Sequence, residues 1–204
     1  MISAMGSMVE GRLAELLARR ALDQAAAAAL GAYAAELNGF LIHVMGDSQA
    51  ANDVLSQVIE DFWRGLGSFH NRCTVRTWLY TLARHAVARY RRSPWHRQRT
   101  GDAQLEGLVA AARSQTPPWQ RTAVKDRWRE LRDALDPDDR ALLVLRVDRG
   151  LEWIDVARVM LCERAPDPCD AELARETVRL RKRFQLLKRE LRKRAREVGL
   201  AEEA

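Results

Sequence analysis

The chain has 204 residues, of which 47% are hydrophobic and 30% charged, and its formal net charge is +6 at pH 7. Sparse Gly and Pro with abundant Ala, Leu, Arg and Glu indicate an all-α fold in one medium domain or two small ones. The positive charge favours an anionic partner, such as nucleic acid or an acidic membrane surface. No apolar run comes near the about 20 residues needed to cross a bilayer, and no signal peptide is visible. We therefore expect a cytoplasmic protein outside the membrane.

The cysteines and histidines do not favour a disulfide framework or a metal site. Cys73, Cys162 and Cys169 are odd in number, and the four histidines fall on different predicted elements, whereas zinc needs about four ligands at short spacings. The sequence also lacks a Gly-rich phosphate loop and a convincing nucleophile–base pair. We therefore expect no metal, no cofactor and no enzymatic activity.

The first predicted module is a helical bundle. Residues 1–8 lack periodicity and are expected to be a tag remnant or a disordered tail, and helices are predicted over 9–20, 22–45 and 49–66. The helix over 49–66 has the clearest apolar periodicity and a stripe wide enough to contact two neighbours. Its opposite face carries Asn52, Asp53, Gln57, Glu60, Asp61 and Arg64.

A further helix is predicted over residues 74–92, with Thr74 as its N-cap. Its apolar stripe is formed by Trp78, Leu79, Leu82, Ala83, Ala86, Val87 and Tyr90. The other face carries Arg76, Thr77, Tyr80, Thr81, Arg84, His85, Arg89 and Arg91. Cations, a ring and hydroxyls on one face suit a polyanion whose bases can stack. For this helix alone, an ordinary solvated basic face is the simpler interpretation.

Residues 93–122 have the composition of a flexible linker. Ser-Pro and Thr-Pro-Pro interrupt the pattern, and a brief helical turn is predicted over 105–113. The segment also carries Trp95 and Trp119. Since a tether needs no tryptophans, parts of it are expected to dock.

The second predicted module covers residues 123–204. Its helices are predicted over 123–135, 137–148, 152–161 and 170–198, and the last two have the form of a helix-turn-helix. The last helix has eleven basic and three acidic residues between Arg175 and Glu197, a net charge of +8. A solvated helix or one lying on a membrane is the alternative, although a membrane helix would carry larger apolar residues.

Two phrases of the first module resemble region 2 of the extracytoplasmic-function (ECF) sigma factors of the sigma-70 family. They are WRGLGSF at residues 63–69 and RTWLYTLAR at residues 76–84, and they stand at the separation found in that family. The second module is similar to region 4 of the same family. The apolar spacing matches at Leu180, Phe184, Leu187 and Leu191. Two matching modules in the right order are far more specific than a helix-turn-helix alone.

The resemblance implies a subunit that binds bacterial core RNA polymerase and gives it promoter specificity. Residues 9–92 would bind core enzyme and read and melt the −10 element, and residues 123–204 would read the −35 element. The implied partners are the clamp helices of the largest core subunit, the second-largest subunit through the second module, promoter DNA and an anti-sigma protein.

The resemblance and the residue types together define three candidate sites. Melting requires stacking on an unpaired base and hydrogen bonds to its edge, and Arg is well matched to guanine in the major groove. The −10 candidates are Phe69, Asn71, Arg72, Thr74, Arg76, Thr77, Tyr80 and Arg84. The −35 candidates are Arg175, Arg179, Arg181, Lys182, Arg183 and Arg189. The candidates for core polymerase are Asp53, Gln57, Glu60, Asp61 and Arg64.

Several residues depart from the family pattern. Ser56 and Gln57 stand where Gln and Glu are usual, His85 where Asn is common, and Arg89 where an acidic residue is common. The loop over residues 162–169 is also longer than a tight helix-turn-helix turn. Two alternatives therefore stay open: a stand-alone helix-turn-helix regulator that does not bind polymerase, and an RNA-binding or antitermination protein.

Overall fold

A computed structural model describes residues 2–93, 123–165 and 167–200, and all regular elements within these ranges are helices. The predicted all-α fold is confirmed. The predicted linker, its helical turn over 105–113 and its two tryptophans, Trp95 and Trp119, lie outside the described residues.

The first bundle follows the predicted helices closely. Its elements are α1 (Ile2–Ala18), α2 (Leu22–Met45), α3 (Ser48–Gly65), the 3-10 turn η1 (Leu66–Ser68) and α4 (Val75–Arg92). Gly46 ends α2 in a left-handed conformation with φ 74°, which glycine adopts without steric cost. Asp47 then caps α3 by accepting from the backbone N–H of Gln49 at 2.7 Å. α1 begins at Ile2 rather than at residue 9, so the disordered tail is wrong, and the tag remnant stays a prediction.

Helix α2 forms the centre of the first bundle. Leu37, Phe40 and Leu41 are completely buried on it, and the helix packs against α1, α3 and α4. By length and composition α2 could cross a membrane, with a mean hydropathy of 1.3, so the expectation that no apolar run comes near this length is wrong. A core helix of a folded bundle passes the same test, and eight residues of α2 are buried against its neighbours.

The second bundle contains α7 (Ala123–Asp133), α8 (Pro137–Leu143), the π-helix η4 (Val144–Asp148), α9 (Trp153–Leu161) and α10 (Asp170–Glu197). Asp136 caps α8, accepting from the backbone N–H of Asp138 at 2.9 Å. The predicted helix over 137–148 is continuous, but its second part is wound as a π-helix. Helix α10 has 28 residues and is therefore about 42 Å long.

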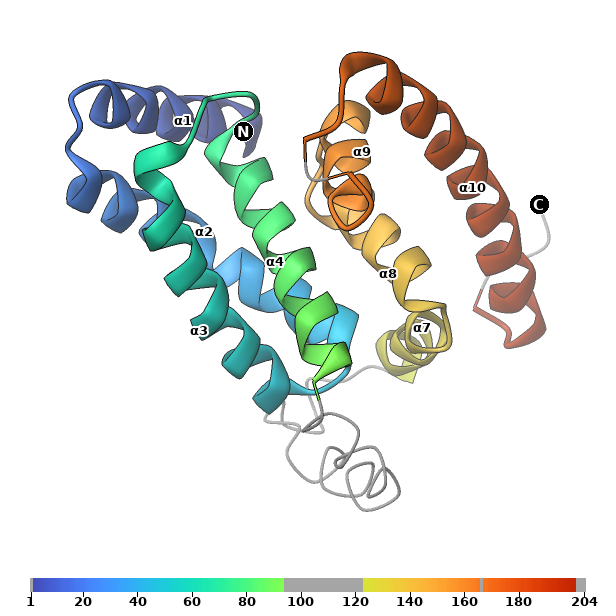
Figure 1. Cartoon of the computed structure of the whole chain (residues 1–204). Coiled ribbons are helices and arrows are strands. Elements are labelled where there is room, and N and C mark those ends of the chain that lie inside the picture. The colour runs from blue at the N-terminus through green and yellow to red at the C-terminus, as the bar shows by residue number, and fades with distance from the viewer. Residues whose placement is uncertain (1, 94–122, 166, 201–204) are drawn as a thin grey trace.

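The two bundles pack directly against each other. Helix α4 contacts α9, and α2 contacts α8, as Figure 1 shows. Buried residues from both bundles, from Leu13 to Leu187, form one continuous apolar cluster. Helices α2 and α4 therefore both face the second bundle, whereas α3 and α10 lie on opposite outer sides (Figure 1).

Candidate nucleic-acid interface

The N-terminus of α4 is held by two caps. Thr74 accepts from the backbone N–H of Thr77 at 3.1 Å, as the sequence predicts. Glu10 of α1 accepts from the backbone N–H groups of Val75 at 2.9 Å and Arg76 at 3.0 Å. These are donors that no residue within the helix can satisfy. Sequence reasoning missed Glu10. In the sequence it is one of several carboxylates on an amphipathic helix, and nothing near it indicates a contact with α4.

A cluster of three aromatic rings joins the two sequence phrases of the first bundle. Phe69 stacks on Trp78 with 4.7 Å between ring centroids, and Phe62 lies 5.1 Å from the same ring. A Cβ atom at Gly65 would come within 3.0 Å of the Trp78 ring, so glycine permits this approach. In this conformation Phe69 stacks within the protein rather than standing free for a base.

The tip of the loop before α4 is exposed. Asn71 and Arg72 are both on the surface, and Asn71 has φ 54°. Asn tolerates this left-handed region better than most residues. Arg72 forms an ion pair with Asp167, from the loop between α9 and α10. Both residues are therefore loop candidates on the surface. Asn71 has a left-handed backbone, and Arg72 already has an anionic partner.

Arg76 and Tyr80 share a carboxylate partner on α2. Glu36 accepts from Arg76 Nε at 2.6 Å and from the Tyr80 hydroxyl at 3.0 Å. Tyr80 is completely buried and lies edge-on to Phe40, with 5.2 Å between ring centroids. Burial, followed by the nearby Glu36 charge, raises the pKa of Tyr80. Tyr80 is therefore a core side chain here, and Glu36 is a positioning residue that sequence reasoning missed.

Thr77 and Arg84 face the second bundle and are covered by it. Thr77 is 2% exposed and Arg84 is 5% exposed, and the Thr77 side chain hydrogen-bonds to Asp155 of α9. Arg84 contacts Asp138 at 2.9 Å and Glu163 at 3.0 Å. The expected open polar face of α4 is therefore wrong for this conformation, because these polar groups find partners in the second bundle. Their contact with DNA stays a prediction.

The outer face of α3 is accessible. Asp53, Glu60 and Arg64 are exposed, and Glu60 and Arg64 form an ion pair one helical turn apart. The Gln57 amide donates to Glu60 and to Asp61, at 3.2 Å each. Trp63 adds a large apolar group that is 52% exposed. An exposed aromatic ring surrounded by polar side chains suits a protein partner.

One departure from the family pattern is explained on the same side of the bundle. Arg89, near the end of α4, forms an ion pair with Asp61 of α3. A basic residue at this position therefore supports the packing of α4 against α3, and an acidic one would repel Asp61.

The outer face of α10 is also accessible, and all six −35 candidates are exposed. Arg181 lies over the Trp153 ring of α9, 5.7 Å from its centroid. Arg179 donates to Glu176 at 2.8 Å, and Arg183 pairs with Asp139 of α8. Three of the candidate cations are thus oriented by contacts within the second bundle.

The described residues hold no group of three or more His, Cys, Asp or Glu side chains arranged for a metal ion. The three cysteines are free thiols. Burial raises the pKa of Cys73 to about 11 and that of Cys162 to about 12. Thiols with such pKa values stay protonated at neutral pH and are poor nucleophiles.

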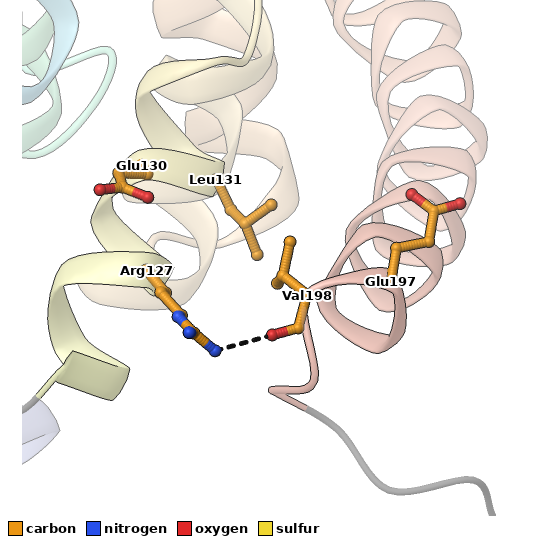
Figure 2. Close-up of a pocket in the computed structure, with 5 residues that line it drawn as sticks. All are labelled: Arg127, Glu130, Leu131, Glu197 and Val198. Carbon is orange, nitrogen blue, oxygen red and sulfur yellow. Dashed lines mark hydrogen bonds between the residues drawn. The ribbon is translucent and has the colours of Figure 1, made fainter.

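A groove lies between α7 and the end of α10 (Figure 2). It is lined by Arg127, Glu130, Leu131, Glu197 and Val198, and Arg127 donates to the Val198 carbonyl oxygen at 3.0 Å. This contact ties the C-terminal turn of α10 to α7. The groove therefore has a structural role within the second bundle.

Comparison with known proteins identifies the family. Residues 30–97 match the family model of sigma-70 region 2. RNA polymerase sigma-H factor of Pseudomonas aeruginosa is 31% identical over 140 residues, which are 64% of this chain and 72% of that protein. ECF RNA polymerase sigma factor SigX of Bacillus subtilis is 26% identical over 163 residues, which are 78% of this chain and 83% of that protein.

Among solved structures, the sigma factor RpoE from Bartonella quintana, crystallised with the anti-sigma factor NepR, covers 78% of this chain and 94% of its own. The two share 16% sequence identity, and the TM-score is 0.47. The identity and coverage of the sequence relatives establish the family by themselves. The chain belongs to the extracytoplasmic-function sigma factors of the sigma-70 family, whose members act in transcription initiation.

Proposed function

We propose that this sigma factor binds core RNA polymerase with residues 9–92 and reads promoters with both bundles. The observation that carries the proposal is that this member of the family exposes two surfaces of different character. An exposed charged face with an aromatic group lies on α3, and an exposed basic face lies on α10. The first suits a protein and the second suits a phosphate backbone.

The finer assignments follow the family resemblance. The α3 face, from Asp53 to Arg64, would contact the clamp helices of the largest subunit, and the second bundle would contact the second-largest. The loop over 69–74 with α4 would read and melt the −10 element, and α10 would enter the major groove of the −35 element. Residues 93–122 would join the modules. The factor would work in the cytoplasm without catalysis of its own, under an anti-sigma protein or under control of its expression.

Run-off transcription with core polymerase on a library of genomic fragments tests the proposal. We expect discrete transcripts that appear only when both core enzyme and this chain are present. Core enzyme alone and the chain alone are the controls. Absence of any promoter-specific transcript, with no co-purification on core enzyme, would contradict the proposal.

A stand-alone helix-turn-helix regulator is the second candidate, favoured by the exposure of the α10 face while α4 is covered. It predicts tight, sequence-selective binding to duplex DNA without polymerase. A sigma factor working through core enzyme predicts weak binding by the chain alone. Selective binding to single-stranded RNA would instead support an RNA-binding or antitermination protein. Band-shift measurements with the same genomic fragments separate these cases.

A further inference from the structure

The loop between α9 and α10 is described at residues 162–165 and 167–169, and both parts contact the first bundle. Glu163 contacts Arg84 of α4 at 3.0 Å, and Asp167 forms an ion pair with Arg72, just before α4. At the start of the loop, the Cys162 thiol lies 3.7 Å from the Thr81 carbonyl oxygen of α4. A tight helix-turn-helix turn has fewer residues with which to make such contacts. The extra length therefore allows one loop to touch α4 and the segment before it.

Helix α8 adds two further contacts between the bundles. Asp138, in its first turn, is the second carboxylate on Arg84, at 2.9 Å. Arg140 donates to the His43 carbonyl oxygen of α2 at 3.1 Å. The Arg84 side chain is only 6% exposed. A guanidinium buried to this extent is tolerated where acidic partners compensate for its lost hydration. The two carboxylates therefore stabilise this arrangement of the bundles.

The acidic partners occupy the same cations that the −10 assignment gives to DNA. A carboxylate and a phosphate use the same N–H groups of an arginine, often as paired hydrogen bonds. While Glu163 and Asp138 hold the buried Arg84 guanidinium, it cannot bind a phosphate, and Asp167 occupies part of the more exposed Arg72 guanidinium. Thr77 is covered at the same interface. The second bundle thus competes with nucleic acid for one surface.

We infer that Glu163 and Asp167 of this loop, together with Asp138, form an intramolecular latch that closes the second bundle over the candidate −10 surface. The inference rests on the proposed function. Opening the latch is required before α4 can bind unpaired DNA. The α3 face stays exposed in the closed chain, so core polymerase can dock before the latch opens. The long loop then has a defined role: it supplies a reversible acidic cover.

The test compares the full-length chain with the loop variant E163Q/D167N. The matched control is E190Q/E197Q, which removes the same charge from α10, where Glu190 and Glu197 pair within their own helix with Arg194 and Lys193. Small-angle X-ray scattering gives the radius of gyration, and fluorescence anisotropy gives the affinity for a labelled single-stranded DNA of mixed sequence. Thermal unfolding confirms that each variant is folded. Adding D138N gives a graded third variant.

We expect the loop variant to have a larger radius than the wild type, which should lie near the about 17 Å of a compact chain of this length. Its DNA affinity should rise about threefold to tenfold, and D138N should increase both changes. Raising the salt concentration should increase the radius of gyration of the wild type more than that of the variant, because the variant already lacks the ionic contacts that salt would screen.

An unchanged radius in both latch variants would overturn the inference. So would an equal rise in DNA affinity in E190Q/E197Q, since added positive charge alone would then explain it. A larger radius with unchanged DNA affinity would contradict the competition for the α4 surface. Run-off transcription by the wild-type chain is measured separately. Its failure would contradict the proposed function, whereas the radius comparison would still decide whether the loop holds the bundles together.

Discussion

The outer face of α3 and the inward face of α4 are neighbours in one bundle, but they differ in what surrounds them. On α3, Asp53 and Glu60 are exposed, and Glu60 pairs with Arg64 of the same helix. On α4, Thr77 and Arg84 are buried by another bundle. The two candidate binding surfaces of the first bundle are therefore not equally accessible in this conformation. One is open as folded, and the other depends on the position of the second bundle.

Replacing Tyr80 by Ala, on the covered side of α4, should have the largest effect of the substitutions considered. Tyr80 is completely buried, so we expect the free energy of unfolding to fall by about 3–5 kcal/mol, as for other buried aromatic truncations. Urea denaturation followed by circular dichroism measures the loss. Tyr80→Phe keeps the ring and removes only the hydroxyl that donates to Glu36, and it should cost about 1 kcal/mol. Near wild-type stability of Tyr80→Ala would mean that the ring is free and available for a base.

The comparison extends to α10. Its basic face is exposed, as the outer face of α3 is. Replacing Arg181 by Ala should weaken promoter binding by the holoenzyme by about 1–3 kcal/mol if Arg181 reads a base edge. Dissociation constants on a promoter fragment and on one with an altered −35 element measure the effect. Arg192→Ala is the control, because Arg192 is exposed about 16 Å further along the helix. An equal loss on both fragments would indicate a phosphate contact instead.

Charge reversal at Asp53 tests the open face by itself. Asp53→Lys should reduce the affinity for core polymerase about fivefold, roughly 1 kcal/mol, as expected for an exposed interfacial charge. It should change the free energy of unfolding by less than about 0.5 kcal/mol. Anisotropy titration of the labelled factor with core enzyme measures the affinity. Glu15→Lys, a reversal at an exposed position on α1, is the control. Equal affinities for both variants would place the polymerase contact away from Asp53.

Helix positions could be predicted because their signals are local. Thr74 caps α4 as predicted. Asp47 and Asp136 cap α3 and α8 within one residue of the predicted helix starts, and Gly46 follows the predicted end of α2. Each of these signals acts over a few residues. The unpredicted start of α1 at Ile2 shows that a segment without apolar periodicity can still continue a helix.

The cover over α4 could not be predicted because it depends on contacts between distant segments. A polar residue on an amphipathic helix is usually exposed, and nothing near Thr77 or Arg84 indicates burial. Their partners, Asp155, Asp138 and Glu163, are more than fifty residues away. The length of the loop over 162–169 was visible in the sequence. Its acidic residues gained a meaning only when the fold placed them against Arg72 and Arg84.

The smallest effect concerns His85, which lies half-buried on α4 beside the latch. Burial lowers its pKa; the Glu163 charge opposes this shift, and the charges of Arg89, Arg84 and Arg92 add to it. The unfolded chain, with an ordinary histidine pKa of about 6.5, then binds the proton more readily than the folded chain. Stability should therefore fall as the pH drops below about 6.5, by at most about 1 kcal/mol. Urea denaturation at several pH values measures this pH dependence of stability, and His85→Gln should remove the part of the slope that His85 contributes.

The opposite effect of Asp155, whose pKa burial raises, cancels in the difference between variant and wild type. His70→Gln, at an exposed loop position, is the control, and equal slopes for both variants would mean that His85 is as well hydrated as the groups on the open face of α3.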